Sequence, residues 1–281
     1  MKREYQKIVD VVKADIDKVN KNLKFEIDLK PKISKELSDF IFEPSKRIRS
    51  LVTILYLRAS KMYLLPEHYE LLSAVELMHN VSLIHDDVID ESKIRRRRKT
   101  LNDKFDNQLA VISGDYLLAE VLKKLSEINS TEIINIFANT LSDMCKGEIE
   151  QYLNRNKITK LEDYIEKSYL KTATLFESSL KASVLLADGE YSEKTEEFIT
   201  NFGIAFQIRD DLLNVINSKT DMNDGIFNAP SILSDDLSVG IEKTKDLLNN
   251  YLNCSKQCIE DMKESPYKTA LYELLELMGD V

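Results

Sequence analysis

The segment Leu83–Arg98 reads LIHDDVIDESKIRRRR and places the strongest negative cluster of the chain beside its strongest positive one. Apolar residues before the aspartates recur at helical spacing, which predicts a helix over 67–92. Asp86 and Asp90 are four positions apart, so they share one face of this helix, with Asp87 beside them. Like charges at this spacing destabilise an isolated helix. The segment therefore predicts a long helix whose acidic end has a cationic partner.

The same periodicity extends along the chain and predicts an all-α fold. The expected helices cover 4–23, 32–42, 45–63, 67–92, 104–126, 131–154, 160–187, 192–217, 231–253 and 255–279. Pro31, Pro44, Pro66 and Pro230 fall between these segments, where they punctuate helices, and strand-like alternation is nowhere sustained. The connection 217–230 is the one long polar loop. Because no composition shift marks a boundary, we expect a single domain over 1–281.

Composition excludes several classes of protein. A net charge of -9 argues against a general nucleic-acid-binding domain, which is usually basic. The cysteines, Cys145, Cys254 and Cys258, form no Cys-x-x-Cys pair, so neither a disulfide framework nor a zinc site is indicated. No segment approaches the roughly 18 apolar residues of a membrane span, and the N-terminus lacks the apolar core of a signal peptide. We expect a soluble, cytoplasmic protein.

A second acidic cluster repeats the first. In FQIRDDLLN, Asp210, Asp211 and Asn214 have the spacing of Asp86, Asp87 and Asp90. If the two helices face each other, their carboxylates form an oxygen-ligand site that suits Mg²⁺. This ion accepts one or two carboxylates and takes its other ligands from water and phosphate. For one such motif alone, a solvated acidic helix end is the alternative.

Basic residues complete a diphosphate-binding pattern. Lys46, Arg47 and Arg49 lie in PSKRIRS, and Lys171 lies in YLKTATLFESS. Carboxylates that hold Mg²⁺ and arginines that pair with oxyanions are two means of binding a diphosphate. We therefore expect the clusters of 83–98 to meet through a bound diphosphate rather than directly. A solvated face or a localisation signal is the alternative for the arginine run.

These segments resemble the trans-isoprenyl diphosphate synthases, also called polyprenyl synthetases. LIHDDVIDESKIRRRRKT is similar to the family's first aspartate-rich motif with its arginine pair, and AVISGDYLLAE to its Gly-Asp helix. YLKTATLF and IAFQIRDDLLN are similar to its Lys-Thr and second aspartate-rich motifs. The resemblance implies an all-α bundle around a deep central cavity, usually in a homodimer.

The resemblance also implies a role for each matched residue. One set would hold Mg²⁺ or lie beside its ligands: Asp86, Asp87, Asp90, Asp210 and Asp211. A second set would contact an allylic diphosphate or flank its reacting carbon: Arg95, Lys171, Thr172 and Gln207. A third set would bind isopentenyl diphosphate: Lys46, Arg49, His79 and Arg96. The implied activity is Mg²⁺-dependent, head-to-tail condensation of isopentenyl diphosphate with an allylic diphosphate.

Product length would depend on the helix wall before the first motif. Met78, Val81 and Ser82 lie one to two turns before Asp86 and are small to medium in size. In short-chain members of the family an aromatic residue near these positions closes the tube. We therefore expect a product longer than farnesyl, with geranylgeranyl first. Leu117, Leu118 and Leu122 either form the floor or pack in the core.

Departures from the family pattern leave two alternatives open. Pro44-Ser45 replaces the usual Gly-Gly, and Arg97 replaces a glycine. Asn214 replaces the last aspartate of the second motif. In DGIFNAP, Ile226 and Asn228 replace a lysine and a threonine. These changes favour a weakly active or regulatory subunit as the first alternative. A class I terpene cyclase is the second, although it would need only one diphosphate site.

The missing lysine at position 226 makes a test possible. The substitution Ile226→Lys should raise activity or lower the Michaelis constant for the allylic substrate, because it restores a cation that can pair with the diphosphate. Steady-state kinetics with varied allylic substrate measure this change. An unchanged or poorer enzyme would contradict the alignment of DGIFNAP with the family segment.

Overall fold

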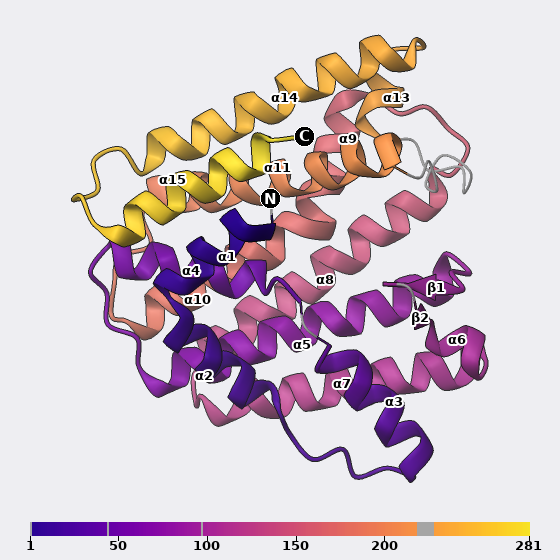
Figure 1. The fold of residues 1–281 in the computed structure, drawn as a ribbon. Helices are drawn as coiled ribbons and strands as arrows, with labels where there is room; N and C mark the ends of the chain where they lie inside the picture. The colour runs from indigo at the N-terminus through magenta and orange to yellow at the C-terminus, as the bar shows by residue number, and fades with distance from the viewer. Residues whose placement is uncertain (1, 44, 97, 218–227) are drawn as a thin grey trace. The chain divides into compact units, whose positions relative to one another are not determined.

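Helices make up most of the chain that the structure describes, as the periodicity predicts (Figure 1). The structure is a computed structural model that describes residues 2–43, 45–96, 98–217 and 228–281. Its helices are α1 (Lys2–Val11), α2 (Lys13–Leu23), α3 (Pro31–Ile41), α4 (Ile48–Ala59), α5 (Pro66–Ile89), α6 (Leu101–Lys104), α7 (Asn107–Glu127), α8 (Thr131–Leu153), α9 (Leu161–Ser168), the π-helix η1 (Tyr169–Ala173), α10 (Thr174–Leu186), α11 (Glu193–Asn217), α13 (Ala229–Leu233), α14 (Leu237–Cys258) and α15 (Pro266–Gly279). The prediction of an all-α fold is confirmed.

The sequence did not predict one element, a short hairpin within the basic run. Strand β1 (Ile94–Arg95) pairs antiparallel with β2 (Arg98–Lys99), and Arg95 lies opposite Arg98. Strands of two residues are too short to produce a detectable alternation of apolar and polar side chains. The hairpin reverses the chain directly after α5.

Local sequence explains where several helices begin. Proline occupies the first turn of α3, α5 and α15, where its missing N–H leaves no intrahelical bond unmade. The side chains of Asp106, Asp236 and Ser265 accept hydrogen bonds from backbone N–H groups in the first turns of α7, α14 and α15. Such caps satisfy donors that would otherwise lack a partner.

Two predicted helices near the C-terminus had the wrong boundaries. The segment 231–253 was expected to be one helix, but α13 ends at Leu233 and α14 begins at Leu237. The segment 255–279 was also expected to be one helix, but α14 ends at Cys258 and α15 begins at Pro266. The Lys268 ammonium donates to the carbonyls of Glu260 and Met262 at 2.8 and 2.9 Å, which stabilises the turn. This contact joins α15 to the connection that precedes it, and the apolar periodicity of the sequence does not reveal it.

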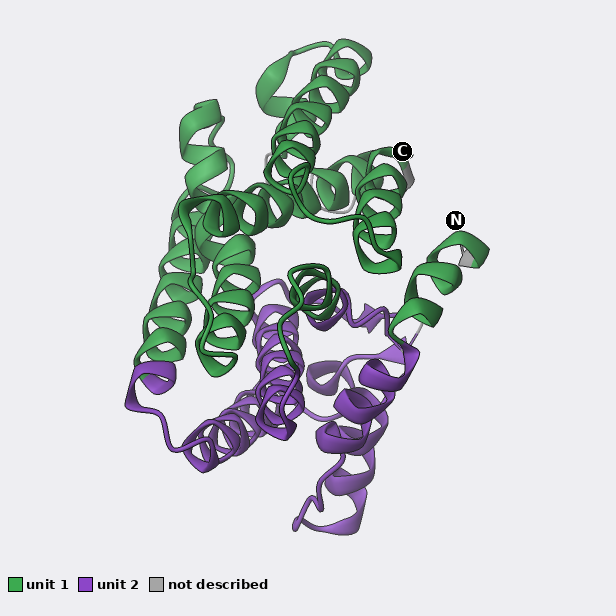
Figure 2. Ribbon diagram, turned by 90° about the vertical axis from the view of Figure 1, so that its left-hand side faces the viewer, with its two compact units in different colours: residues 1–12, 52–63, 135–281 green, residues 13–51, 64–134 purple. Residues whose placement is uncertain are grey.

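The chain forms two compact units (Figure 2). Unit 1 contains residues 1–12, 52–63 and 135–281, and unit 2 contains 13–51 and 64–134. The chain passes between them several times, so neither unit is a continuous segment. The two aspartate motifs lie in different units, the first in unit 2 and the second in unit 1.

In unit 2, α5 packs against α7 and α2. Residues at helical spacing face inward, such as Leu71, Val75 and Met78 on α5 and Leu117 and Val121 on α7, and all are nearly or fully buried. Gly114 and His85 bring α5 and α7 close together. A Cβ atom at Gly114 would lie 2.2 Å from His85 Nε2, so only glycine leaves room for the imidazole ring.

In unit 1, α11 packs against α14, α10 and η1. Three phenylalanines form its aromatic core. The Phe176 ring lies 5.4 Å from Phe202, and Phe198 lies 6.3 Å from Phe202, between ring centroids. Gly203 brings α11 against η1, because a Cβ at this position would lie 2.6 Å from Ala173 Cα. α15 packs on α14 and also contacts α1.

Within the described residues, we find no helix whose length and apolarity would let it cross a membrane.

The close approach at Gly203 predicts an asymmetry between two glycine substitutions. The variant Gly203→Ala should lower the free energy of unfolding by about 1–3 kcal/mol, because the new methyl group meets the backbone of Ala173. The matched control is Gly279→Ala, whose new Cβ would lie an ordinary 3.4 Å from Leu252 and should be neutral or slightly stabilising. Urea unfolding followed by circular dichroism measures both. Equal stability of the two variants would contradict the tight packing of α11 on η1.

Candidate functional site

The C-terminal end of α5 presents two aspartates and buries a third. α5 ends at Ile89, and Asp90 occupies the C-cap, where its backbone N–H donates to the carbonyl of Asp86 at 2.8 Å. Asp86 and Asp90 are partly exposed, whereas Asp87 is buried. The unpaired carbonyls at a helix C-terminus add negative potential to these carboxylates. The pair Asp86 and Asp90 therefore lies where a cation binds favourably.

Asp87 has a direct partner in the basic run. Arg95 Nε donates to Asp87 Oδ1 at 2.8 Å, and Asn102 Nδ2 donates to the Asp87 carbonyl at 3.1 Å. Burial raises the pKa of Asp87, and the Arg95 guanidinium opposes this rise. The expectation that the two charge clusters meet only through a bound diphosphate is therefore wrong for this pair. A carboxylate with so little exposure requires a charge partner or several hydrogen bonds.

The other cations of the basic run also have carboxylate neighbours. Arg96 and Arg98 each lie 3.8 Å from Glu43, and Lys99 lies 2.8 Å from Asp103. Arg96 has φ 49°, in the left-handed region, at the turn of the hairpin. The Arg98 and Lys99 side chains pair with these carboxylates while they stay largely exposed, at 59% and 67%. Sequence reasoning missed Glu43 because it lies far from the run along the chain.

His79 lies within a basic cluster in unit 2. Burial lowers the pKa of His79 well below its ordinary value, and Arg49, Arg96, Arg95 and Arg47 lower it further. The imidazole is therefore neutral at pH 7, because a proton on it would add a charge beside four guanidinium groups. Three of the four residues predicted to bind isopentenyl diphosphate, Arg49, His79 and Arg96, are thus brought together.

Arg47 forms a structural ion pair. Its guanidinium lies 3.7 Å from the buried Glu76 carboxylate, which also accepts from the Ser50 backbone N–H at 3.2 Å and hydroxyl at 2.8 Å. Arg47 also donates to the Ile41 carbonyl at 3.1 Å. These bonds tie the start of α4 to α5. The fourth predicted residue, Lys46, is exposed and precedes Arg47 in the chain.

The second acidic cluster lies on α11 and has the same construction as the first. Asp210 is exposed, whereas Asp211 is buried. Gln207 Nε2 donates to Asp211 Oδ1 at 2.7 Å, and the Tyr164 hydroxyl donates to Oδ2 at 2.8 Å. Burial, and then the Asp211 charge, raise the pKa of Tyr164 well above its ordinary value, so the phenol keeps its proton. Both oxygens of Asp211 therefore have protein donors.

The predicted Lys-Thr residues lie on η1. The Thr172 hydroxyl donates to Gln207 Oε1 at 2.6 Å, and Lys171 forms an ion pair with Glu148 of α8. Gly147 permits this approach, since a Cβ there would lie 2.8 Å from the Lys171 backbone nitrogen. Single π-helical turns are frequent at functional sites. The sequence carried no signal for the π-turn, because it arises from packing rather than from composition.

The predicted wall residues lie on α5, before Asp86. Met78 and Val81 are buried, and the partly exposed Ser82 donates its hydroxyl to the His79 carbonyl at 2.9 Å. The three leucines considered for a floor do not share one environment. Leu117 is fully buried, whereas Leu122 is 54% exposed, so Leu122 does not line a buried tube within this chain.

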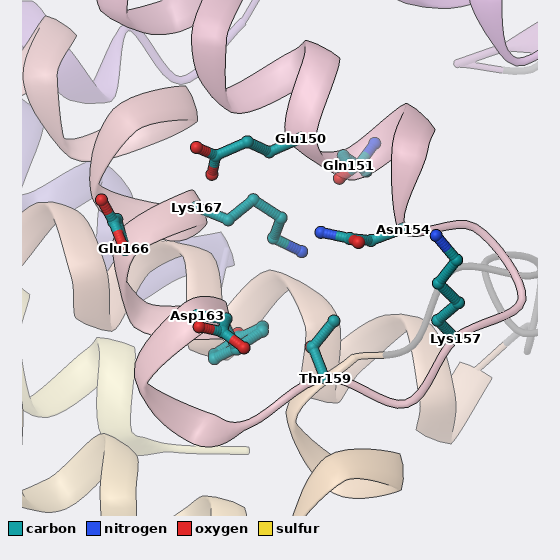
Figure 3. Close-up of a pocket in the computed structure, with 9 residues that line it drawn as sticks. Glu150, Gln151, Asn154, Lys157, Thr159, Asp163, Glu166 and Lys167 are labelled. Carbon is teal, nitrogen blue, oxygen red and sulfur yellow. The ribbon is translucent and has the colours of Figure 1, made fainter.

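A polar cavity of about 360 Å³ opens between the end of α8 and α9 (Figure 3). It is lined by Glu150, Gln151, Asn154, Lys157, Thr159, Asp163, Tyr164, Glu166 and Lys167. Lys167 and Asn154 point toward each other across it. Lys167 Nζ lies 5.0 Å from the centre of the Tyr164 ring, so Tyr164 connects the cavity wall to Asp211.

Several sequence predictions fall outside the described residues. Pro44, Arg97, Gly225, Ile226 and most of the loop 217–230 belong to this group. Asn228, in place of the family's threonine, is buried, and its Oδ1 accepts from the Ser231 hydroxyl at 2.9 Å.

Among the residues that the structure describes, no three or more His, Cys, Asp or Glu side chains cluster closely enough to hold a metal ion by themselves. Each aspartate motif offers one or two outward carboxylates. This donor set matches Mg²⁺, which takes its remaining ligands from water and substrate phosphates.

Comparison with known proteins identifies the family. The family model described as polyprenyl synthetase matches residues 30–269. The chain belongs to the polyprenyl synthetase family. A prenyl transferase from Synechocystis sp. is 33% identical over 79% of this chain and 73% of its own length. A decaprenyl-diphosphate synthase from Dictyostelium discoideum is 30% identical over 88% of this chain and 62% of its own.

Solved structures show the same fold. A polyprenyl synthase from Caulobacter crescentus, crystallised with calcium and isoprenyl diphosphate, superposes with a TM-score of 0.89. It is 23% identical, and the match covers 99% of this chain and 98% of that one. The predicted isoprenoid synthase fold is thereby confirmed, and the prediction of a trans-prenyltransferase is confirmed at the level of the family.

Sequence reasoning missed three residues that organise the polyprenyl synthetase motifs: Glu43, Glu148 and Tyr164. Each is a single residue of a common type, far along the chain from its partner. A tyrosine seven positions before Lys171, in the segment LEDYIEKS, carries no sequence signal of a role in the site. Only the fold shows that its hydroxyl reaches Asp211.

The basic cluster predicts how His79 titrates. In the protein without ligand its pKa should lie well below 6.5, because burial disfavours the imidazolium and the arginines repel it further. Inorganic diphosphate should raise this pKa, because the anion neutralises the arginines. The imidazole signals in NMR spectra across a pH series measure both values, and His79→Asn assigns the signal. A pKa near 6.5, or one that diphosphate leaves unchanged, would contradict an anion site at His79.

Proposed function

We propose that the chain is a Mg²⁺-dependent prenyltransferase that condenses isopentenyl diphosphate head-to-tail with an allylic diphosphate. The observation that carries this proposal is the shared construction of its two aspartate motifs. The leading aspartates, Asp86 and Asp210, reach solvent, whereas Asp87 and Asp211 are buried and bound by protein donors. Outward carboxylates on a rigid support suit a hard cation that is shared with a substrate phosphate.

The metal proposal assigns separate tasks within each motif. Asp86, Asp90 and Asp210 would hold Mg²⁺, and Asp87 and Asp211 would keep these carboxylates in place. When bound, Mg²⁺ neutralises the charge that develops on a leaving diphosphate. The Caulobacter structure, which holds calcium and isoprenyl diphosphate, supports the binding of a divalent cation in this family.

Isopentenyl diphosphate is assigned to the basic cluster in unit 2. Arg49 and Arg96 lie close enough to His79 to lower its pKa, and Lys46 lies beside Arg47 just before α4. A neutral imidazole can donate one N–H to a diphosphate oxygen while the guanidinium groups supply charge. This second diphosphate site argues against the terpene cyclase alternative, which needs only one.

The allylic diphosphate is assigned to Arg95, Lys171 and Gln207. Carboxylates hold both cations in place, Asp87 for Arg95 and Glu148 for Lys171. Gln207 Nε2 bonds to Asp211 and carries a second hydrogen that a phosphate oxygen can accept. Because each cation is already held by its own carboxylate, each would stabilise the leaving group with little local reorganisation.

The reaction then needs little acid–base chemistry from the chain. Cleavage of the allylic carbon–oxygen bond leaves a carbocation, which Thr172 would flank, and the isopentenyl double bond attacks it. A proton is then lost, and the departed diphosphate can accept it, so no side-chain base is required. Arg95 and Lys171 would retain that diphosphate through their N–H groups.

The proposed product is longer than farnesyl. Met78, Val81 and Ser82 carry no ring that would close a tube beside α5. Geranylgeranyl is the product that the sequence suggested first. The similarity to a decaprenyl-diphosphate synthase favours the longer end of this range.

We also propose that 1–281 acts as one domain in a cytoplasmic homodimer. The family model spans residues of both units, which supports one functional domain. On α7, Val111 and Leu122 are 40% and 54% exposed and lie on one face with Leu118. A second copy that covers this apolar face would account for its exposure. Light scattering after size-exclusion chromatography measures the mass.

One assay tests the proposed function against its alternatives. Purified protein is incubated with Mg²⁺, labelled isopentenyl diphosphate and allylic primers of increasing length, and the dephosphorylated products are sized. Chain-extended alcohols support the proposal, and their loss with EDTA supports the metal. Cyclised hydrocarbon from primer alone would instead indicate a cyclase. No product would indicate a regulatory or inactive subunit, the reading that Asn214 favours.

The variant Asp86→Ala should lower turnover by about two orders of magnitude or more, because it removes a carboxylate from the proposed metal site. Helicity by circular dichroism should not change, since this side chain is partly exposed at the end of α5. The matched control is Asp17→Ala, which removes an exposed carboxylate of α2 paired only with Lys13. Full activity of Asp86→Ala with intact helicity would exclude the metal assignment.

A further inference from the structure

A continuous chain of hydrogen bonds connects α9, α11 and η1 within unit 1. It begins at the Tyr164 hydroxyl, which donates to Asp211 Oδ2 at 2.8 Å. Gln207 Nε2 donates to the other oxygen, Oδ1, at 2.7 Å. The Thr172 hydroxyl donates to Gln207 Oε1 at 2.6 Å. Residues of α9, η1 and α11 are therefore joined in one network around the Asp211 carboxylate.

The direction of each bond in this chain is determined by its members. Asp211 is a carboxylate and can only accept, so Tyr164 and the Gln207 amide nitrogen must donate to it. The Gln207 carbonyl oxygen is then left to accept from Thr172. Removing the Tyr164 donor would leave Oδ2 of a buried carboxylate without this bond, and Asp211 could then rotate.

Tyr164 itself has little freedom to move. Its side chain is buried, with 1% exposure, and α9 continues directly into η1 through Tyr169. The Lys167 ammonium lies over its ring. The ring therefore presents its hydroxyl to Asp211 from a rigid position.

We propose that Tyr164 is a positioning residue that fixes the Asp211 carboxylate and, through Gln207, the Thr172 hydroxyl. With both oxygens bound, Asp211 serves as an anchor rather than as a metal ligand. The exposed Asp210 beside it then presents its carboxylate from a helix that cannot turn. This inference rests on the proposed function for the roles of Asp210 and Thr172, although the anchoring of Asp211 is an observation.

A purely structural role would predict a different result. In that case the Tyr164 hydroxyl only satisfies a buried carboxylate, and its loss lowers stability alone. Unit 2 provides a matched control with the same chemistry. The buried Tyr69 hydroxyl donates to the buried Asp15 at 2.7 Å, and neither residue belongs to the proposed site.

The experiment compares Tyr164→Phe with Tyr69→Phe. Both variants keep the ring and lose one short bond to a carboxylate, so both should lower the melting temperature. Tyr69→Phe also removes the bond that the Tyr69 oxygen accepts from Lys18 Nζ at 3.3 Å. Only Tyr164→Phe should weaken binding of Mg²⁺ with inorganic diphosphate, by threefold or more in calorimetry. It should also lower kcat about tenfold while changing the KM for isopentenyl diphosphate less than twofold, since the basic cluster is untouched.

A double variant tests the route through Asp211. In an Asp211→Ala background, Tyr164→Phe should cause no further loss of Mg²⁺–diphosphate affinity, because the anchored group is already gone. If Tyr164→Phe does not fold, Asp211→Asn replaces it in the same measurements, since it keeps the shape and removes the charge.

The outcomes separate the two proposals. Wild-type protein without prenyl transfer would overturn the proposed function, and the calorimetric comparison would then decide the role of Tyr164 alone. Equal Mg²⁺–diphosphate binding by wild type and Tyr164→Phe, including no binding by either, would overturn the positioning role. Additive losses in the double variant would overturn it as well.

Discussion

Burial of a carboxylate next to an exposed one is the constraint on which the arrangement of both aspartate motifs depends. An ionised carboxylate loses its hydration when it is buried, so it must be paired and hydrogen-bonded. Asp87 meets this requirement with Arg95, and Asp211 meets it with Tyr164 and Gln207. The adjacent leading aspartates point outward because neighbouring positions on a helix face different directions. In each motif, the buried carboxylate and its protein donors thus orient the exposed carboxylate beside it.

The same rule separates structural cations from cations that can serve a ligand. The buried Glu76 carboxylate pairs with Arg47 and accepts a hydrogen bond from Ser50 in the first turn of α4. These bonds fix the start of α4 and thereby place Arg49 beside His79. The arginines keep His79 neutral, so the cluster concentrates positive charge in guanidinium groups, which pair well with phosphate oxygens. An acidic protein can therefore contain a strongly basic site. Its net charge is a sum over the whole chain and does not describe the charge within this cluster.

Backbone irregularities provide the close contacts that regular helices would not allow. The π-turn of η1 carries Lys171 and Thr172, and glycines at positions 147 and 203 let α8 and α11 approach it. A side chain at either glycine would meet backbone atoms. This contact brings Lys171 to Glu148 and Thr172 to Gln207. The close packing around η1 therefore determines where the Lys171 and Thr172 side chains lie.

The amino-acid sequence by itself determined the all-α class, most helix positions, the two aspartate motifs and the family. These features depend on local periodicity and on residues close together along the chain. The tertiary structure alone decided which aspartate of each pair is buried, that Arg95 binds Asp87 directly, and that Glu43, Glu148 and Tyr164 take part. It also decided the hairpin, the π-turn and the break after Cys258. The physical reason is that Glu43, Glu148 and Tyr164 act on partners distant in sequence, which only the packing of helices brings near. The hairpin and the Arg95–Asp87 bond are local, but they leave no periodic signal in the sequence.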